Sequence, residues 1–432
     1  MVKHTNNMKR EDISFVLFDQ QRQFNEEKPI IKRELSKRAL ELIKLNLPLV
    51  ITGVRRCGKS YLLKIIKDEL RLKEKEYLYI NFNDERFIDF SVEDFQKIID
   101  FLNEQKYNEK CFLFIDEIQE VDNWEKWIDR IKESYKIVIT GSNSKLLSSE
   151  ISTILTGRSL SLMLTPLNFR EFLGAKKISI ENWKMDLKKQ AEIRSLFKDY
   201  LVNGGFPKHV LTGENIIIKE LYEQILYRDI IERFSKSRTK VIKEISVSLL
   251  SNPSSLVSMR QISATTHIKN LGSVKSILDA FESSFLFFFV NKFDFSVKKQ
   301  TQNPRKVYCI DNGFPVALGF RLSDDMGKLI ENLTAVELKR KGKEVFYHSD
   351  KNECDFVIRE GNKIAEAIQV CYNLTEDNKG RETKGLIEVM ERFKLKEGLI
   401  LTYDQTDEFK IGTIRIKVLP VWKWLLDDKK FD

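Results

Sequence analysis

Residues 53–60 have the sequence Gly53-Val54-Arg55-Arg56-Cys57-Gly58-Lys59-Ser60, which matches the pattern G-x-x-x-x-G-K-[ST]. The apolar run that precedes it, 47–52, predicts a buried parallel strand. The ten residues that follow, 61–70, have the apolar periodicity of a helix. The segment therefore lies between a strand and a helix, which is the context that a phosphate-binding loop requires.

The residue types of this segment suit the close binding of a triphosphate. Gly53 and Gly58 let the backbone turn and approach the phosphates without a Cβ clash. Successive N–H groups and the positive end of the next helix then face the anion. Lys59 is expected to reach the β and γ oxygens, and the Ser60 hydroxyl to bind Mg²⁺. We therefore expect ATP and Mg²⁺ as cofactors, with nucleotide contacts from Gly53, Val54, Arg55, Arg56, Cys57, Gly58, Lys59, Ser60 and Tyr61.

A second apolar strand, 111–115, ends in the acidic pair Asp116 and Glu117. Carboxyl ends of neighbouring parallel strands meet at one crevice, so this pair should face the phosphate-binding loop. We expect Asp116 to hold Mg²⁺ and Glu117 to act as the general base on the attacking water.

A third strand, 136–140, is followed by small polar residues. Asn143 or Ser142 could contact the γ-phosphate or the water, and the sequence does not choose between them. The alternative is that these residues only form a turn.

The fold class predicted by this order of elements is α/β. A further strand at 77–82 and crossover helices at 92–105 and 123–134 indicate a parallel sheet with helices on both faces. We divide the chain into a helical lead-in, an ATPase domain, a helical and winged-helix-like region, and a C-terminal domain, with the boundaries 1–46, 47–175, 176–306 and 307–432.

Composition excludes several classes of protein. With 432 residues, 42% of them hydrophobic and 32% charged, the chain is neither disordered nor fibrous. The longest apolar run, 285–290, is too short to span a bilayer, and the first residues do not resemble a signal peptide. The five cysteines form no CxxC pair, which favours a reducing cytoplasm over a disulfide framework. For Cys57, inside the loop, a reactive thiol and a buried small side chain are the two alternatives.

These motifs resemble the P-loop ATPases of the AAA superclass in bacteria and archaea, and most closely the subgroup with a C-terminal nuclease-like domain of unknown function. The resemblance covers most of the chain from about Arg33 onward. Besides the loop and the acidic pair, it rests on Thr140 to Leu147, Leu155 to Arg158, Thr165-Pro166-Leu167-Asn168-Phe169-Arg170-Glu171-Phe172 and Gly204-Gly205-Phe206-Pro207. It implies Mg²⁺-dependent ATP hydrolysis, with Arg158 as a γ-phosphate sensor or a trans-acting arginine, or else as a plain surface cation.

The middle of the chain is predicted to be helical from 186 to 235, including one long helix over 216–234. Two short helices at 257–263 and 273–281 and a strand at 285–290 have the outline of a winged helix. The net charge of the chain is +9, and 291–306 alone carries five cations against one acid. A DNA partner is compatible with this charge, and an ATPase lid or a protein-docking module is the alternative.

The C-terminal third is predicted to be a mixed α/β domain with the layout of PD-(D/E)XK nucleases, a restriction-endonuclease-like fold. A helix at 325–341 offers Glu331 or Glu337, and a strand at 354–359 offers Asp355. The last strand departs from the layout, because Gln369 stands where the metal-binding Glu belongs and Cys371 where the Lys belongs. We therefore expect a nuclease-like fold without robust cleavage.

The leading functional hypothesis is an ATP hydrolase that acts as a conformational switch or motor, with DNA as one candidate partner, and oligomers are compatible with it. A DNA-processing enzyme with an active C-terminal nuclease is the second hypothesis. A non-catalytic scaffold stabilised by ATP is the third.

Overall fold

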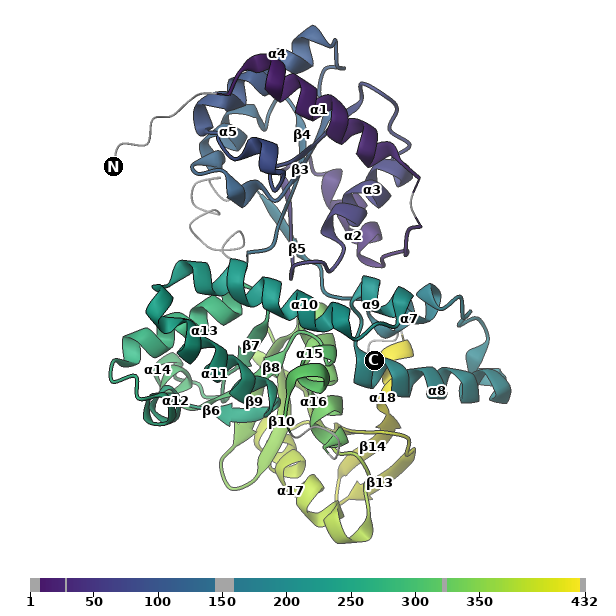
Figure 1. Ribbon diagram of the computed structural model, residues 1–432. Coiled ribbons are helices and arrows are strands. Elements are labelled where there is room, and N and C mark those ends of the chain that lie inside the picture. Colours follow the sequence, from purple (N-terminus) through teal and green to yellow (C-terminus); the bar gives the residue numbers. More distant parts are fainter. Residues whose placement is uncertain (1–7, 28, 144–158, 321–324, 428–432) are drawn as a thin grey trace. The chain divides into compact units, whose positions relative to one another are not determined.

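The computed structural model describes residues 8–27, 29–143, 159–320 and 325–427 (Figure 1). The chain divides into two compact units, Met1–Leu164 and Thr165–Asp432. The finer division into four parts stays a prediction. Within the described residues, no helix combines the length and the apolar character needed to cross a bilayer.

The first unit is built on a five-stranded parallel sheet with the strand order β2-β3-β4-β1-β5. The predicted strands are confirmed, and β5 is an addition at the edge. Because both faces of the inner strands are covered, their residues form nearly continuous apolar runs rather than alternating ones. The strands are β1 (Leu49–Thr52), β2 (Tyr77–Asn81), β3 (Phe112–Asp116), β4 (Lys136–Gly141) and β5 (Leu160–Met163).

Helices cover both faces of this sheet, as predicted (Figure 1). Apolar side chains of α1, α4 and α5 form one core with the strands, including stacked Phe95 and Trp127. Helix α3, which follows the phosphate-binding loop, contacts α2, β3 and β4. The helices are α1 (Arg10–Asn25), α2 (Leu35–Ile43), α3 (Lys59–Glu69), α4 (Phe95–Glu104) and α5 (Trp124–Ile131).

The edge strand β2 is capped by side chains of α1 instead of a sixth strand. The Gln21 carboxamide accepts from Tyr79 N at 3.0 Å. Gln20 both accepts from Asn81 N at 2.9 Å and donates to the Asn81 carbonyl at 3.0 Å. These side chains therefore satisfy backbone groups that an open edge would expose to other chains.

The second unit begins with helices, in agreement with the prediction for 186–235. The long helix expected over 216–234 is present, but it changes character: α10 continues as a π-helical segment, Ile225–Ile230, and then as a 3₁₀ turn, Ile231–Arg233. The helices before the winged helix are α7 (Phe169–Ala175), α8 (Leu187–Asn203), α9 (Pro207–Thr212) and α10 (Ile216–Gln224).

A winged helix follows, as the sequence predicts. Its order is helix, strand, two helices, strand, wing and strand, and the three strands pair antiparallel in the order β6-β8-β7. Buried Val274, Ile277 and Phe281 hold its third helix against the strands. The elements are α11 (Thr239–Leu250), β6 (Ser255–Val257), α12 (Met259–Thr266), α13 (Leu271–Ser283), β7 (Phe287–Val290), α14 (Val297–Gln302) and β8 (Arg305–Cys309). The boundary predicted between residues 306 and 307 falls inside β8.

The C-terminal part is a six-stranded mixed sheet with the order β13-β14-β12-β11-β10-β9, where only the pairs β11–β12 and β12–β14 are parallel. Leu386, Val389 and Met390 of α17 pack on its strands. Its strands are β9 (Glu344–Ser349), β10 (Glu353–Glu360), β11 (Lys363–Val370), β12 (Glu397–Thr402), β13 (Asp407–Ile411) and β14 (Ile414–Pro420), and the helices are α15 (Gly313–Leu318), α16 (Met326–Arg340), α17 (Glu376–Phe393) and α18 (Val421–Leu426).

Two of the motifs quoted for the family resemblance form one buried polar cluster in this unit. Leu167 N donates to the Gly205 carbonyl at 2.8 Å, and Gly205 N donates to Asp311 Oδ2 at 2.7 Å. The Arg340 guanidinium of α16 donates to Thr165 Oγ1 at 2.7 Å. The cluster connects the first residues of the second unit, and Gly205, to side chains more than a hundred positions later in the sequence. Packing within this unit therefore explains these motifs.

A substitution at Gly205 tests whether packing explains these motifs, because a Cβ at that position would lie 2.2 Å from the Leu167 carbonyl oxygen. The backbone on both sides is fixed by the cluster, so we expect Gly205→Ala to destabilise the second unit by about 1–3 kcal/mol. Gly380→Ala is the control, since no atom lies within 4 Å of a Cβ in that helix. Thermal denaturation should show a lower melting temperature for the first variant alone, and equal melting temperatures would contradict the explanation.

Candidate functional site

The loop between β1 and α3 has the backbone geometry of an anion-binding turn. Gly58 has φ of 106°, which favours glycine, and it directly precedes α3. A Cβ on Gly53 would lie 2.0 Å from the Leu164 carbonyl oxygen, so only glycine fits there. The first N–H groups of α3 have no acceptor within the helix and carry its positive dipole end. The residues present therefore fit a bound phosphate chain.

Lys59 lies buried at the first position of α3. Its ammonium donates to the carbonyls of Gly53 at 3.1 Å and Val54 at 3.4 Å, and it pairs with the Glu117 carboxylate at 3.1 Å. Burial acts to lower the pKa of Lys59, but Glu117 and nearby acids raise it above its usual value. The ammonium therefore stays charged beside the turn.

Asp116, at the end of β3, accepts hydrogen bonds from three hydroxyl groups. Ser60 Oγ lies 2.5 Å from Asp116 Oδ2, Tyr79 OH donates to the same oxygen at 2.8 Å, and Thr140 Oγ1 donates to Oδ1. Burial, followed by the charge of Glu117, raises the pKa of Asp116. A serine hydroxyl and a carboxylate in contact offer the oxygen ligands that Mg²⁺ prefers, so the predicted pair Ser60 and Asp116 fits this metal.

Glu117 is held in an unusual conformation, with φ of 54° for a residue that is not glycine. Its Oε2 accepts from Ser142 N at 3.0 Å, and its own N–H donates to Thr140 Oγ1 at 3.2 Å. Burial would raise the pKa of Glu117, but the Lys59 ammonium holds it below its usual value. The carboxylate therefore stays ionised between the loop and the end of β4.

The remaining predicted residues have different positions. Asn143 follows Ser142, the residue after β4 whose N–H donates to Glu117. Tyr61 is 46% exposed on α3, and Arg56 is exposed in the turn. Arg158 lies outside the described residues.

Cys57 is a buried side chain whose thiol faces the protein interior. Its Sγ points to the Leu164 carbonyl at 3.3 Å, away from solvent, and burial raises its pKa. Its backbone carbonyl accepts from Arg33 Nη1 at 2.7 Å, which braces the turn from the segment before α2. Of the two alternatives for this residue, the structure supports the small buried side chain.

Sequence reasoning missed three residues of this site, Tyr79, Thr140 and Arg33. The first two are strand residues whose hydroxyls face Asp116, and both strands were predicted. The position of Thr140 at the end of its strand was a usable signal, because that end faces the crevice. Nothing near Arg33 in the sequence indicated its contact with the loop.

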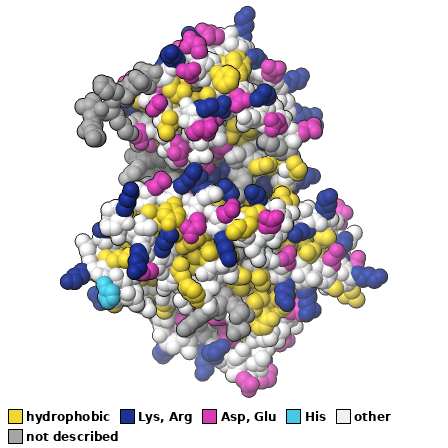
Figure 2. Space-filling model, in the orientation of Figure 1, with side chains coloured by type: hydrophobic (Ala, Val, Ile, Leu, Met, Phe, Trp, Pro, Cys, Tyr) yellow, Lys and Arg dark blue, Asp and Glu magenta, His cyan; other side chains and the backbone are white. Residues whose placement is uncertain are grey.

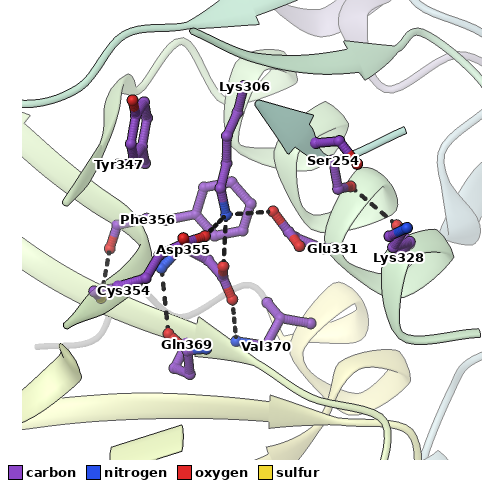
Figure 3. A network of polar contacts seen from close by, with 12 residues as sticks. Ser254, Lys306, Lys328, Glu331, Tyr347, Cys354, Asp355, Phe356, Gln369 and Val370 are labelled. Carbon is purple, nitrogen blue, oxygen red and sulfur yellow. Dashed lines mark hydrogen bonds and ion pairs between the residues drawn. The ribbon is translucent and has the colours of Figure 1, made fainter. Parts of the chain in front are cut away.

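The second unit contains another buried lysine among carboxylates (Figure 3). Lys306 of β8 contacts Glu331 of α16 at 3.0 Å, Asp355 of β10 at 2.7 Å and Glu353 at 2.7 Å. Of the two helix acids left open by the sequence, the structure thus brings Glu331 to Asp355. Glu337 pairs with Arg340 instead.

Gln369 also lies at this cluster, while Cys371 contributes no donor or ligand to Lys306. Gln369 Oε1 accepts from Asp355 N at 3.2 Å, and its Nε2 donates to Glu382 of α17 at 3.1 Å. Cys371 is buried in the apolar core of the domain, and burial raises its pKa to about 12. The lysine of the cluster therefore comes from β8, and not from position 371.

Residues 45–173 match the family described as AAA domain, and residues 194–325 match a domain of unknown function, DUF8612. The first unit is thus an AAA-type P-loop ATPase domain, with the parallel sheet, the loop and the acidic pair described above. Among solved structures, the Walker-type ATPase PABY2304 of Pyrococcus abyssi aligns with a TM-score of 0.44 at 15% identity, over 68% of this chain and 99% of its own.

The whole chain is 37% identical over 398 residues to the uncharacterized protein MJ1544 of Methanocaldococcus jannaschii, covering 87% of this chain and 88% of that protein. An uncharacterized protein of Haemophilus influenzae is 31% identical over 392 residues, covering 87% of this chain and 94% of its own length. The chain belongs to the family of these proteins.

The buried thiols lead to a prediction. All five cysteines are buried, and burial raises the pKa of Cys57 and of Cys111. We expect a disulfide reagent such as Ellman's reagent to leave the native protein unmodified at neutral pH and to modify all five thiols after denaturation. Rapid native labelling of Cys57 that ATP prevents, located by mass spectrometry, would instead restore the reactive-thiol alternative.

Proposed function

We propose that the first unit binds ATP with Mg²⁺ and hydrolyses it. The observation that carries this proposal is the convergence of Lys59, Ser60, Asp116 and Glu117 at the carboxyl ends of β1 and β3, two parallel strands on either side of β4. Each of these side chains touches another member of the group at 3.1 Å or less. Positive charge, a hydroxyl and two acids at an anion-binding turn are the groups that phosphoryl transfer to water requires.

Lys59 has two kinds of partner in this arrangement. Its present acceptors are two carbonyls of the turn and the Glu117 carboxylate. A phosphate oxygen bound at the turn would compete with Glu117 for the Lys59 ammonium, because that oxygen also carries negative charge. We infer that Lys59 moves to the phosphates when nucleotide binds, which frees one carboxylate oxygen of Glu117.

Glu117 then acts as the general base. Ser142 N still fixes its second oxygen, so the freed oxygen keeps its orientation and can accept a proton from water. Ser60 and Asp116 hold Mg²⁺, which when bound neutralises charge on the phosphates. Asn143, Tyr61 and the loop residues complete the contacts, and Arg158 stays a candidate for a second cation at the γ-phosphate.

DNA is the partner that we propose for the second unit, on the evidence of the winged helix. The start of α13 exposes Lys275, Ser276 and the preceding N-cap residue Asn270, and this is the part of such a helix that reaches base edges. Exposed cations flank it on α12, in the turn between α12 and α13, and on the wing: Arg260, Lys269, Lys298 and Lys299. Figure 2 shows Lys and Arg side chains over this part of the molecule. ATP turnover would then act as the switch for DNA engagement.

The two alternatives have less support. A C-terminal nuclease would retain the PD-(D/E)XK layout through Glu331 and Asp355, but Gln369 is neutral and Lys306 already contacts both acids. A purely stabilising role for ATP leaves the pairing of Glu117 with Lys59 and Ser142 N unexplained.

The ATPase proposal predicts that two substitutions differ in their effect on nucleotide binding. Glu117→Gln should keep nucleotide binding and lower kcat at least about 100-fold, because the general base is lost. Lys59→Ala should lose binding and turnover together. Lys73→Ala removes an exposed lysine of the same unit and should change neither. Phosphate release and calorimetry with MgATP measure both quantities, and parental turnover in Glu117→Gln would contradict the assignment.

The DNA proposal predicts that replacing exposed lysines of the winged helix lowers the affinity for DNA and weakens the salt dependence of DNA binding. Replacing Lys298 and Lys299 by Ala should weaken binding of a fluorescent duplex and reduce the slope of log K against log salt by about 0.9 per lost phosphate contact. The matched control is Lys394→Ala with Lys396→Ala, which removes the same charge from an exposed site outside the winged helix. Fluorescence anisotropy at several salt concentrations measures the slope, and equal slopes would contradict the proposed surface.

A further inference from the structure

Lys306 is the central cation of an acidic pocket in the second unit. Its side chain is 3% exposed, although lysine is normally a surface residue. The ammonium has three carboxylate neighbours within 3.0 Å, from Glu331, Glu353 and Asp355. In Figure 3 the side chain extends from β8 into the space between the acids of α16 and β10. Three different elements therefore meet on one Nζ atom.

The other polar atoms of the pocket are also engaged. Asp355 Oδ2 accepts from Val370 N at 3.0 Å, while its Oδ1 accepts from Lys306. Tyr308 OH, two residues along β8, donates to Glu331 Oε1 at 2.8 Å. Each carboxylate oxygen in these contacts already has a hydrogen-bond donor. Both oxygens of Asp355 and one oxygen of Glu331 thus belong to a network in which the ammonium supplies the positive charge.

The ligand type by itself would suit a divalent cation. Two buried carboxylates and a third at the pocket's edge are hard oxygen ligands, and the predicted nuclease-like layout implies a metal between the helix acid and the strand acid. The arrangement does not fit such an ion as it stands, because Lys306 Nζ lies at hydrogen-bond distance from both of those acids. A metal held by the same oxygens would have to displace the ammonium.

The charge of Lys306 is stable in this setting. Burial acts to lower its pKa, but Asp355 and Glu331 raise it well above the usual value. Burial and the Asp355 charge raise the pKa of Glu331 to about 8. The ammonium therefore stays charged among the three acids, and a divalent cation at the same oxygens would meet its positive charge.

We propose that the Lys306 ammonium is the permanent cation of this pocket and takes the place of a divalent metal ion. The C-terminal sheet is therefore metal-independent, and the same ammonium anchors the last strand of the winged helix to α16 and β10. This inference concerns the second unit alone and does not depend on ATP hydrolysis in the first.

The test compares Mn²⁺ binding, without nucleotide, in the full chain and three variants. Lys306→Ala removes the charge and opens space, so it should gain Mn²⁺ binding and a rise in melting temperature on the order of 4 °C at saturating Mn²⁺. Lys306→Met removes the charge but fills the space, and it should gain much less. Lys306→Ala with Asp355→Asn should lose the gain. Calorimetry and thermal shift measure both effects, and any binding in the first unit is common to all variants.

Two results would overturn the proposal. One is Mn²⁺ binding by the parent chain that Asp355→Asn abolishes, because the ammonium would then not occupy the position. The other is a folded Lys306→Ala variant with no Asp355-dependent gain.

If Lys306→Ala does not fold, a variant that lacks Lys306 and the two buried acids of the pocket provides the test instead. Lys306→Met combined with Glu331→Gln and Asp355→Asn should regain soluble, cooperatively melting protein that Lys306→Met alone loses, because both buried acids are then neutral and the remaining one, Glu353, is 45% exposed. Equal losses in the single and triple variants would show that the charge of Lys306 is not what the pocket needs.

Discussion

The contact between Lys59 and Glu117 is the interaction on which the ATPase site depends. Glycine positions at 53 and 58 allow the turn, but the turn needs a cation beside it, and that cation is buried. An unpaired buried ammonium would be costly, and the acid that follows β3 stabilises it. The same pair keeps Glu117 ionised, which is the protonation state that a general base needs.

Much of the fold was predictable because the decisive signals are local. The loop, its strand and its helix are contiguous, and the acidic pair ends a strand whose apolar run is easily recognised. The parallel sheet brings strand ends to one crevice, so Asp116 could be placed there, although its strand is not the neighbour of β1 that the sequence suggested, since β4 lies between them. The winged helix was predictable for a similar reason, since its helices and strands follow one another along the chain.

The remaining contacts depend on packing between distant segments, which no local pattern records. Tyr79 reaches Asp116 across 37 residues, and Lys306 reaches Asp355 across 49. Alignment to a nuclease layout placed a cysteine where a lysine was expected, while a lysine came from a strand of the preceding winged helix. Arg33 and the glutamines of α1 likewise act through side-chain contacts that depend on how α1 and its following segment lie against the sheet. The direction of the Cys57 thiol was ambiguous because a loop thiol can point to either side.

Two buried lysines thus meet carboxylates in this protein, and their surroundings separate their roles. Lys59 has backbone carbonyls as well as one acid as partners, and it stands at a helix start where an anion is favoured. It can exchange one negative partner for another without being left unpaired. Lys306 has three acids from two other segments, α16 and β10, and no comparable anion site in its described contacts. If Lys306 moved away, these carboxylates would face one another without a cation between them. An ammonium that can change partners suits a nucleotide site, whereas one that cannot is suited to holding domains together.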